Sequence, residues 1–172
     1  MSGKEANYWD ACIFLALLKD EKRDDPNIML GIKEQAKLFD EGKIDIATST
    51  LILAEILPHH EDNPPNLLDN FLAMTERRNF HFVEPTMQVV LLANKIRDAI
   101  HHRDYPNLDI PDSIHLASAI ASKCQTFYTL DGSREDRKGL GLLQVPQSIK
   151  DEHNILISKP FSTLPPELPG IN

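Results

Sequence analysis

The sequence predicts an α/β fold in which helices cover both faces of a parallel sheet, and three observations predict it. Short apolar segments alternate with helical stretches of about ten or more residues, an order typical of strand–helix–strand crossovers. The 172 residues suffice for one domain with a substantial core, and the 41% hydrophobic content is ordinary for a globular protein. Acidic residues follow several predicted strands, where a parallel sheet gathers its strand ends at one edge.

The N-terminal part contains the first predicted strand and two helices. Residues 7–10 are short and aromatic, and the apolar run after them continues as a buried helix to about residue 20. A charged loop with Pro26 follows. Residues 28–41 carry apolar side chains at helical spacing, and Gly42 ends that helix.

The second strand is predicted at residues 44–47. Hydroxyl side chains at residues 48–50 can cap the helix that we expect over residues 51–57. Pro58 ends this helix, because proline lacks the backbone N–H and clashes with the preceding turn. Residues 58–66 are polar and rich in proline, so we expect an exposed loop.

The alternation of strand and helix continues in the second half of the chain. Residues 67–77 predict a helix, residues 80–83 alternate as a strand, and residues 87–100 form a long helix. A polar loop leads to Pro111, a residue favoured in the first turn of a helix, and we expect a helix over residues 112–123.

The last predicted strands are at residues 126–130 and 142–145, with a turn at Asp131. Proline is frequent in the final stretch of the chain, which favours extended or disordered structure. We therefore expect a single domain at residues 1–150 and a C-terminal extension at residues 151–172.

The net charge of −8 limits how the chain can bind nucleic acid. Affinity that rests on neutralising phosphates usually comes with positive charge, so tight, non-specific nucleic-acid binding is disfavoured. A nuclease is not excluded, since a metal site needs local carboxylates. Charged residues among the first twenty predict no signal peptide, so the cytoplasm is the expected compartment. Cys12 and Cys124 are expected to be buried, reduced thiols.

Four carboxylates, on Asp10, Glu55, Asp112 and Asp131, lie where a strand is followed by a helix or turn, or on the helix itself. If the strands are parallel, right-handed crossovers bring these acids into one crevice at the sheet edge. Like charges that close raise one another's pKa unless a cation lies between them. A divalent metal would resolve the repulsion and would suit the crevice to hydrolysing phosphodiesters.

Each acid also has an ordinary structural interpretation. Glu55 is the only polar side chain in its predicted helix, and a buried carboxylate is costly unless it binds a metal or forms a salt bridge, for instance with Arg97. Asp10 and Asp112 can each stabilise the first turn of a helix, and Asp131 is a common turn residue. Taken singly, these alternatives stay open.

Four segments around these acids share the pattern of a known family: residues 9–13, 48–56, 111–119 and 129–131. Through them the chain resembles the PIN domain family of nucleases, which includes toxins of bacterial toxin–antitoxin pairs. The third segment is the most similar, because its acid is followed by a helix of hydrophobic and small residues.

The resemblance implies a three-layer fold with a parallel sheet of about five strands, dependence on Mg²⁺ or Mn²⁺, RNA as the usual substrate and frequent homodimers. It implies that Asp10, Glu55, Asp112 and Asp131 form the catalytic and metal-binding set, with Asp10 and Asp112 as the expected direct ligands. The chain departs from the family at Cys12, which replaces a usual small polar residue and is expected to weaken a hydrogen bond near the site.

These observations predict a metal-dependent endonuclease for RNA, or for single-stranded DNA, that can be the toxin of a toxin–antitoxin pair with an antitoxin protein as partner. Arg134, Arg137 and Lys138 follow Asp131 and are candidate phosphate contacts, although a solvated charged loop explains them equally well. The main alternative is a PIN-like domain without turnover that binds nucleic acid or protein. A phosphohydrolase that needs a second acid two places after the first is disfavoured, because Cys12 stands there.

Overall fold

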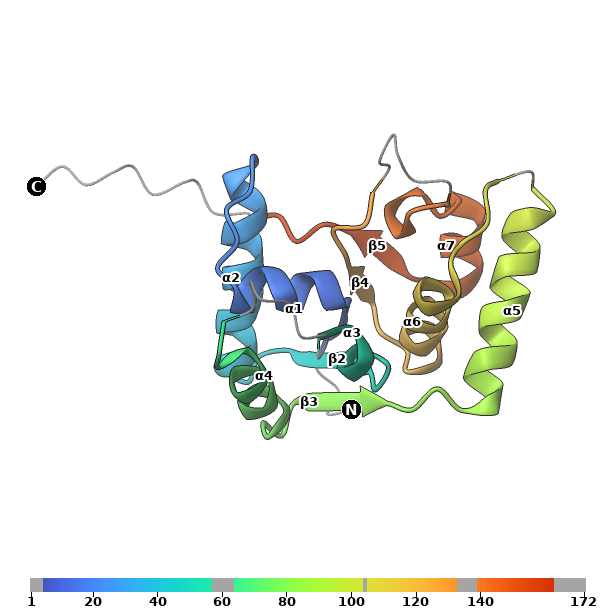
Figure 1. Ribbon diagram of the computed structural model, residues 1–172. Helices are drawn as coiled ribbons and strands as arrows, with labels where there is room; N and C mark the ends of the chain where they lie inside the picture. The colour runs from blue at the N-terminus through green and yellow to red at the C-terminus, as the bar shows by residue number, and fades with distance from the viewer. Residues whose placement is uncertain (1–4, 57–63, 104, 133–138, 163–172) are drawn as a thin grey trace, which may run out of the picture.

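The computed structural model describes residues 5–56, 64–103, 105–132 and 139–162, which fold around one five-stranded sheet (Figure 1). All the strands are parallel and lie in the order β3-β2-β1-β4-β5, so β1 is central. The strands are β1 Ala6–Trp9, β2 Asp45–Ser49, β3 Phe80–Val83, β4 Thr126–Tyr128 and β5 Leu156–Ser158. The predicted α/β class and the parallel sheet are confirmed.

Helices cover both faces of the sheet and make three layers (Figure 1). One core cluster joins α1, α2, α3 and α4 to the sheet, and a second joins α5, α6 and α7 to the opposite face. Within the described ranges, no helix has the length and apolar character that a membrane span requires. The helices are α1 Ala11–Leu18, α2 Pro26–Asp40, α3 Ile52–Ile56, α4 Leu67–Thr75, α5 Met87–His101, α6 Ile110–Ala121, α7 Gln147–His153 and the short 3-10 helix η1 Leu142–Gln144.

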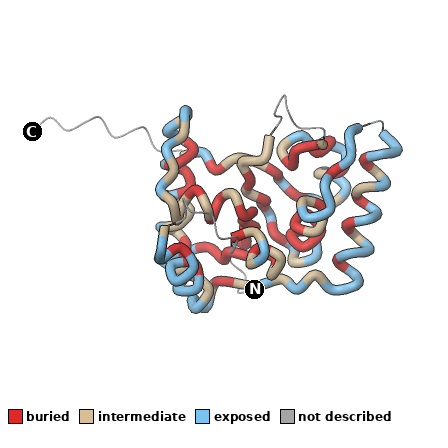
Figure 2. The backbone as a smooth tube through the Cα atoms, viewed as in Figure 1, coloured by how far each residue is buried: buried red, intermediate tan, exposed pale blue. Residues whose placement is uncertain are grey.

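The neighbouring strands β1 and β2 are buried along their whole length, and buried residues fill the interior between the helices (Figure 2). This is expected of parallel strands that are covered on both faces. Side chains alternate between the faces of a strand, so Tyr8 packs in the cluster with α6 while Trp9 packs in the cluster with α1. The alternation therefore directs Tyr8, and not Trp9, towards α6.

The predicted strand at residues 142–145 is wrong, and the fifth strand lies later in the chain. These residues form η1 instead, because Asp131 holds their backbone: Leu142 N–H donates to Asp131 Oδ2 at 2.9 Å and Leu143 N–H donates to the Asp131 carbonyl at 3.0 Å. β5 lies within the segment expected to be an extension, and α7 precedes it. With three residues, of which only Ile157 is buried, β5 gives almost no sequence signal.

The segment after β5 crosses α2 at very close range. A side chain at Gly31 would place its Cβ 2.0 Å from the Pro160 carbonyl oxygen, so only glycine fits there. Two hydrogen bonds fix the crossing: Ser162 N–H donates to the Asn27 carbonyl at 3.3 Å, and Ser162 Oγ donates to Glu34 at 3.0 Å. This contact explains a glycine in the interior of a long helix.

The buried thiol of Cys124 is expected to lower the free energy of unfolding at alkaline pH. Both cysteines are free, and burial raises the pKa of Cys124 from 9.0 to about 11. The folded state holds this proton more tightly than the unfolded chain, so the contribution to stability is full below about pH 9 and is lost as the pH rises towards 11. Between about pH 8 and pH 10.5 we expect wild type to lose about 2 kcal/mol of unfolding free energy relative to Cys124→Ala, measured by urea denaturation. A difference that stays constant would contradict this shift.

Candidate active site

Asp10 lies just after the central strand, where it begins α1. Its Oδ1 accepts a hydrogen bond from the Ala11 N–H at 2.8 Å, so the capping role is present. Its Oδ2 accepts hydrogen bonds from the Thr129 hydroxyl at 2.7 Å and from the Cys12 thiol at 3.1 Å. Asp10 is 6% exposed. These donors fix the orientation of the carboxylate and still leave capacity for a cation, because a carboxylate offers about four acceptor positions.

Cys12 and Thr129 join the ends of β1 and β4 around Asp10. Thr129 Oγ1 accepts a hydrogen bond from the Asp131 N–H at 3.0 Å while it donates to Asp10. The Cys12 sulfur accepts one from the Leu130 N–H at 3.1 Å while the thiol donates to Asp10. Burial, and after it the charge of Asp10, raises the pKa of Cys12 well above 9.0, so the thiol remains a donor. Cys12 therefore still supplies a hydrogen bond to Asp10, through a thiol that is a weaker donor than a hydroxyl.

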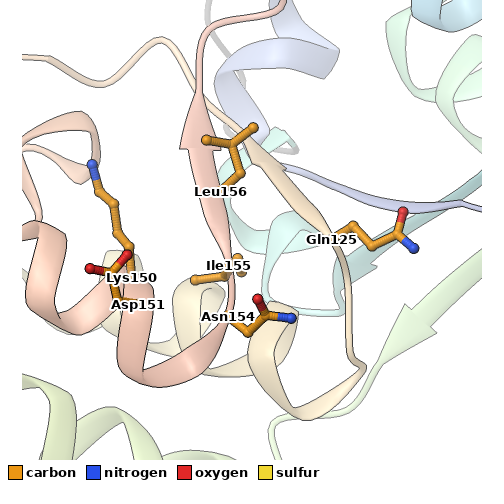
Figure 3. A pocket seen from close by; sticks show the side chains of 6 residues that line it. All are labelled: Gln125, Lys150, Asp151, Asn154, Ile155 and Leu156. Carbon is orange, nitrogen blue, oxygen red and sulfur yellow. The ribbon is translucent and has the colours of Figure 1, made fainter.

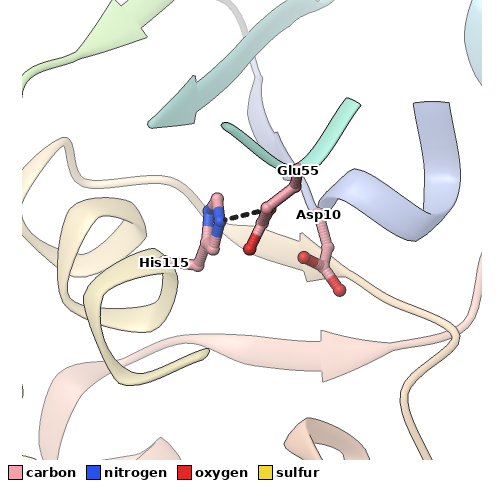
Figure 4. A group of neighbouring side chains, drawn as sticks. All are labelled: Asp10, Glu55 and His115. Carbon is pink, nitrogen blue, oxygen red and sulfur yellow. Dashed lines mark hydrogen bonds and ion pairs between the residues drawn. The ribbon is translucent and has the colours of Figure 1, made fainter. Parts of the chain in front are cut away.

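Glu55 projects from α3 towards His115 and lies beside Asp10 (Figure 4). Its Oε2 accepts a hydrogen bond from His115 Nε2 at 2.9 Å, and its side chain is 29% exposed. Arg97, the partner that the sequence left open, instead donates its Nε–H to the Leu108 carbonyl at 3.0 Å. Glu55 is thus more exposed than Asp10, the acid beside it.

His115, on α6, is the candidate functional residue that the sequence analysis missed. It is 0% exposed, and its Nδ1 lies 2.7 Å from the Tyr8 hydroxyl oxygen. Burial lowers the pKa of His115, but the hydrogen bond to Glu55 and the charges of the nearby carboxylates outweigh it, so the pKa is raised above 6.5. A signal was available, because His115 follows Asp112 by three positions and therefore shares a helix face with it.

Asp10, Glu55 and His115 form a group whose possible metal ligands all lie within 4.8 Å of one another (Figure 4). Because His115 Nε2 is engaged with Glu55, the donors best placed for a cation are carboxylate oxygens. Oxygen ligands suit Mg²⁺ and Mn²⁺ better than softer metals. The residues present therefore fit a hard divalent cation.

Asp112 lies beside this group and not within it. It occupies the first turn of α6, one turn before His115, and its charge contributes to the raised pKa of that histidine. The sequence analysis expected Asp10 and Asp112 to be the direct ligands. Here it is Glu55 whose carboxylate converges with Asp10.

Asp131 follows β4 and is tied to Asp10 through one intervening side chain. Its N–H donates to Thr129 Oγ1, whose hydroxyl donates to Asp10. Its Oδ2 accepts a hydrogen bond from the Leu142 N–H at 2.9 Å, which fixes the loop into η1. The predicted phosphate contacts Arg134, Arg137 and Lys138 lie outside the described residues.

A surface pocket lies at the amino ends of β4 and β5, away from these acids (Figure 3). Gln125 and Ile155 precede β4 and β5, so the pocket opens at the amino ends of parallel strands, whereas Asp10 follows the carboxyl end of β1. In open α/β sheets, ligands bind at the carboxyl ends. The acid group is therefore the candidate site, and the pocket is not.

Three solved structures resemble this fold along most of both chains. VapBC2 from Rickettsia felis, bound to a DNA fragment from its promoter, has 13% identity and a TM-score of 0.56, and the match covers 89% of this chain and 97% of that chain. DNA-bound VapBC from Salmonella typhimurium has 14% identity and a TM-score of 0.54, with 90% and 97% covered. VapC20 from Mycobacterium tuberculosis, a Sarcin-Ricin loop cleaving toxin, has 15% identity and a TM-score of 0.52, with 74% and 91% covered.

The comparison of sequences assigns the family. No curated protein sequence matches the chain closely enough to count as a relative. The family model of the PIN domain matches residues 8–137, which is most of the chain and includes all four predicted acids. This chain belongs to the PIN domain family.

Proposed function

We propose that this PIN domain is a metal-dependent endonuclease that hydrolyses phosphodiester bonds in RNA. The convergence of Asp10 and Glu55, with ligand atoms within 4.8 Å, is the observation that carries the proposal. Carboxylates this close repel one another unless a cation lies between them. Their position at the carboxyl edge of the sheet, in a PIN fold, supports a reaction site.

Asp10 and Glu55 would hold the cation, Mg²⁺ or Mn²⁺, and Asp112 and Asp131 would complete the catalytic set as neighbouring acids. When bound, such an ion lowers the pKa of a coordinated water and stabilises charge on the phosphate oxygens. Asp10 is held in one orientation by its hydrogen-bond donors, so little reorganisation is needed on binding.

The substrate would approach from the side of Glu55, the acid of the group that reaches solvent. Arg134, Arg137 and Lys138, which follow β4 in the chain, are proposed to contact its phosphates. A local basic strip of this kind would offset the net charge of −8. Single-stranded DNA is the alternative substrate.

We further infer that the chain acts in the cytoplasm as the toxin of a toxin–antitoxin pair, as a homodimer that an antitoxin protein binds. The three similar structures support this inference, since one is a toxin that cleaves the Sarcin-Ricin loop and two are VapBC assemblies bound to DNA.

A cleavage assay titrated with metal tests the proposed activity. The purified chain is incubated with mixed RNA and with single-stranded DNA, in Mg²⁺, in Mn²⁺ and in chelator. We expect RNA fragments only with metal, and recovery of cleavage when Mn²⁺ is added back after chelation. Cleavage that persists in chelator would overturn the metal dependence, and metal-dependent binding without cleavage would favour a binding module.

Asp112→Asn is expected to abolish cleavage, by about 100-fold or more, while the fold is retained. The reason is that a neutral amide cannot replace a carboxylate beside a cation. Asp98→Asn is the matched control, because Asp98 is an exposed aspartate on α5. Circular dichroism and urea denaturation check the fold of both variants, and undiminished activity in Asp112→Asn would exclude a catalytic role.

A further inference from the structure

A directed chain of hydrogen bonds runs from the backbone of β2 to Glu55. The Ser49 N–H, which can only donate, lies 2.7 Å from the Tyr8 hydroxyl oxygen. Tyr8 accepts there, so its own hydrogen can be donated to His115 Nδ1 at 2.7 Å. With Nδ1 accepting, a neutral imidazole carries its hydrogen on Nε2, which lies 2.9 Å from Glu55 Oε2. A protonated imidazole also has a hydrogen on Nε2, so Glu55 faces a donor in both states.

The middle of this series of hydrogen bonds is fully enclosed. Tyr8 and His115 are both 0% exposed. The Tyr8 ring stacks on Phe127 with centroids 4.9 Å apart and meets the His115 ring edge-on at 5.9 Å. Burial raises the pKa of Tyr8 well above 10.0, so the hydroxyl keeps its hydrogen. Both side chains are therefore held by packing as well as by hydrogen bonds.

Glu55, at the end of this series of hydrogen bonds, is its most exposed side chain. It lies on α3, a helix of five residues, whereas His115 lies on α6, which has twelve. The buried side chains of Ile52 and Ile56 anchor α3, but the side chain of Glu55 is 29% exposed. Repulsion from Asp10 would also turn the Glu55 carboxylate away from the site. The hydrogen bond from His115 opposes this repulsion and holds the Glu55 carboxylate near Asp10.

We propose that His115, oriented by Tyr8, is a positioning residue that sets the Glu55 carboxylate for cation binding. The hydrogen bond occupies Oε2, which leaves Oε1 for the metal that the proposed function requires. Tyr8 and His115 touch neither metal nor substrate in this account. They act through Glu55, as hydrogen-bonding partners of metal ligands commonly do.

The test is the affinity for Mn²⁺, measured by isothermal titration calorimetry on the full chain without nucleic acid. We expect Tyr8→Phe and His115→Phe to weaken Mn²⁺ binding by about 10-fold or more, the usual effect of removing such a partner. His115→Gln keeps an N–H donor at this position and is expected to lose less. Tyr128→Phe is the matched control, because it removes a hydroxyl from the neighbouring strand β4 and should leave the affinity unchanged.

A double-mutant cycle separates positioning from direct metal ligation and from structural damage. If Tyr8 acts through Glu55, Tyr8→Phe should have no further effect on Mn²⁺ affinity in a Glu55→Gln background. Effects that multiply in the double variant would overturn the proposal, because Tyr8 would then act independently of Glu55. Tyr8→Phe is a small change, so the cycle remains decisive even if His115→Phe fails to fold.

The outcomes distinguish this inference from the proposed function on which it rests. Wild-type chain that binds no Mn²⁺ overturns both the metal centre and the positioning role. Wild type and Tyr8→Phe that bind Mn²⁺ equally well overturn the positioning role alone. Weakened binding in Tyr8→Phe that depends on Glu55 supports the inference, whatever nucleic acid proves to be the substrate.

Discussion

Asp10→Asn is expected to reduce cleavage by about 100-fold or more, which corresponds to about 3 kcal/mol of transition-state stabilisation. The asparagine oxygen can still accept the hydrogen bond from the Ala11 N–H, so the cap of α1 is retained. The negative charge that draws a cation is lost. Repulsion from Glu55 falls at the same time, but the amide nitrogen that replaces Oδ2 cannot accept the hydrogen bonds of the Thr129 hydroxyl and the Cys12 thiol, so we expect the free energy of unfolding to fall by about 1–3 kcal/mol.

The prediction for Asp10 is checked by measuring kcat and Mn²⁺ affinity together. Asp45→Asn is the matched control, because Asp45 is also a buried aspartate beside the central strand but pairs with His81 at 3.3 Å at the start of β2. Its cleavage rate per folded molecule should be unchanged. Asp10→Asn with the activity of wild type would remove the central acid from the reaction and with it the proposed mechanism.

Phe71→Ala is expected to destabilise the fold by about 3–5 kcal/mol, the usual cost of emptying a buried aromatic site. Phe71 on α4 is 0% exposed, and its ring meets those of Phe14 and Phe80 at centroid distances of 5.4 Å and 6.2 Å. These rings join α1 and α4 to β3. The truncation would remove this bridge and leave a cavity between the helical layer and the sheet.

Leu72→Ala is the control for this truncation, since Leu72 is the next residue of the same helix but is 42% exposed. It should change the free energy of unfolding by about 0.5 kcal/mol or less. Both variants are compared with wild type by urea denaturation. Equal effects of the two substitutions would contradict the packing described for α4.

The fold could be predicted from the sequence where the pattern was long and strongly periodic. Helices such as α5, Met87–His101, show their apolar face over several turns. β5 could not be predicted, because a three-residue edge strand with one buried side chain resembles any loop. The error at residues 142–145 has a different cause. This apolar run would suit a strand, but two of its backbone N–H groups donate hydrogen bonds to Asp131.

The site could be predicted only in part, since sequence indicates which side chains are available but not which of them meet. Asp10 and Glu55 stood out because they interrupt apolar segments. His115 did not, because a histidine on an apolar helix has many ordinary explanations. Its role depends on Tyr8, which is 107 positions away in the chain. Similarly, Glu55 pairs with His115 and not with Arg97, the partner that the sequence suggested, because of how α6 packs on the sheet.

The hydrogen bond between Thr129 and Asp10 joins groups 119 positions apart, and this separation has a consequence for biosynthesis. A growing polypeptide that has not yet reached β4 lacks the strand that pairs with one side of β1. It also lacks the Thr129 hydroxyl, which donates a hydrogen bond to Asp10. Partial translation products would therefore hold Asp10 without the hydrogen bond from Thr129 that orients its carboxylate. Only a chain that has been synthesised past β4 can complete the proposed site.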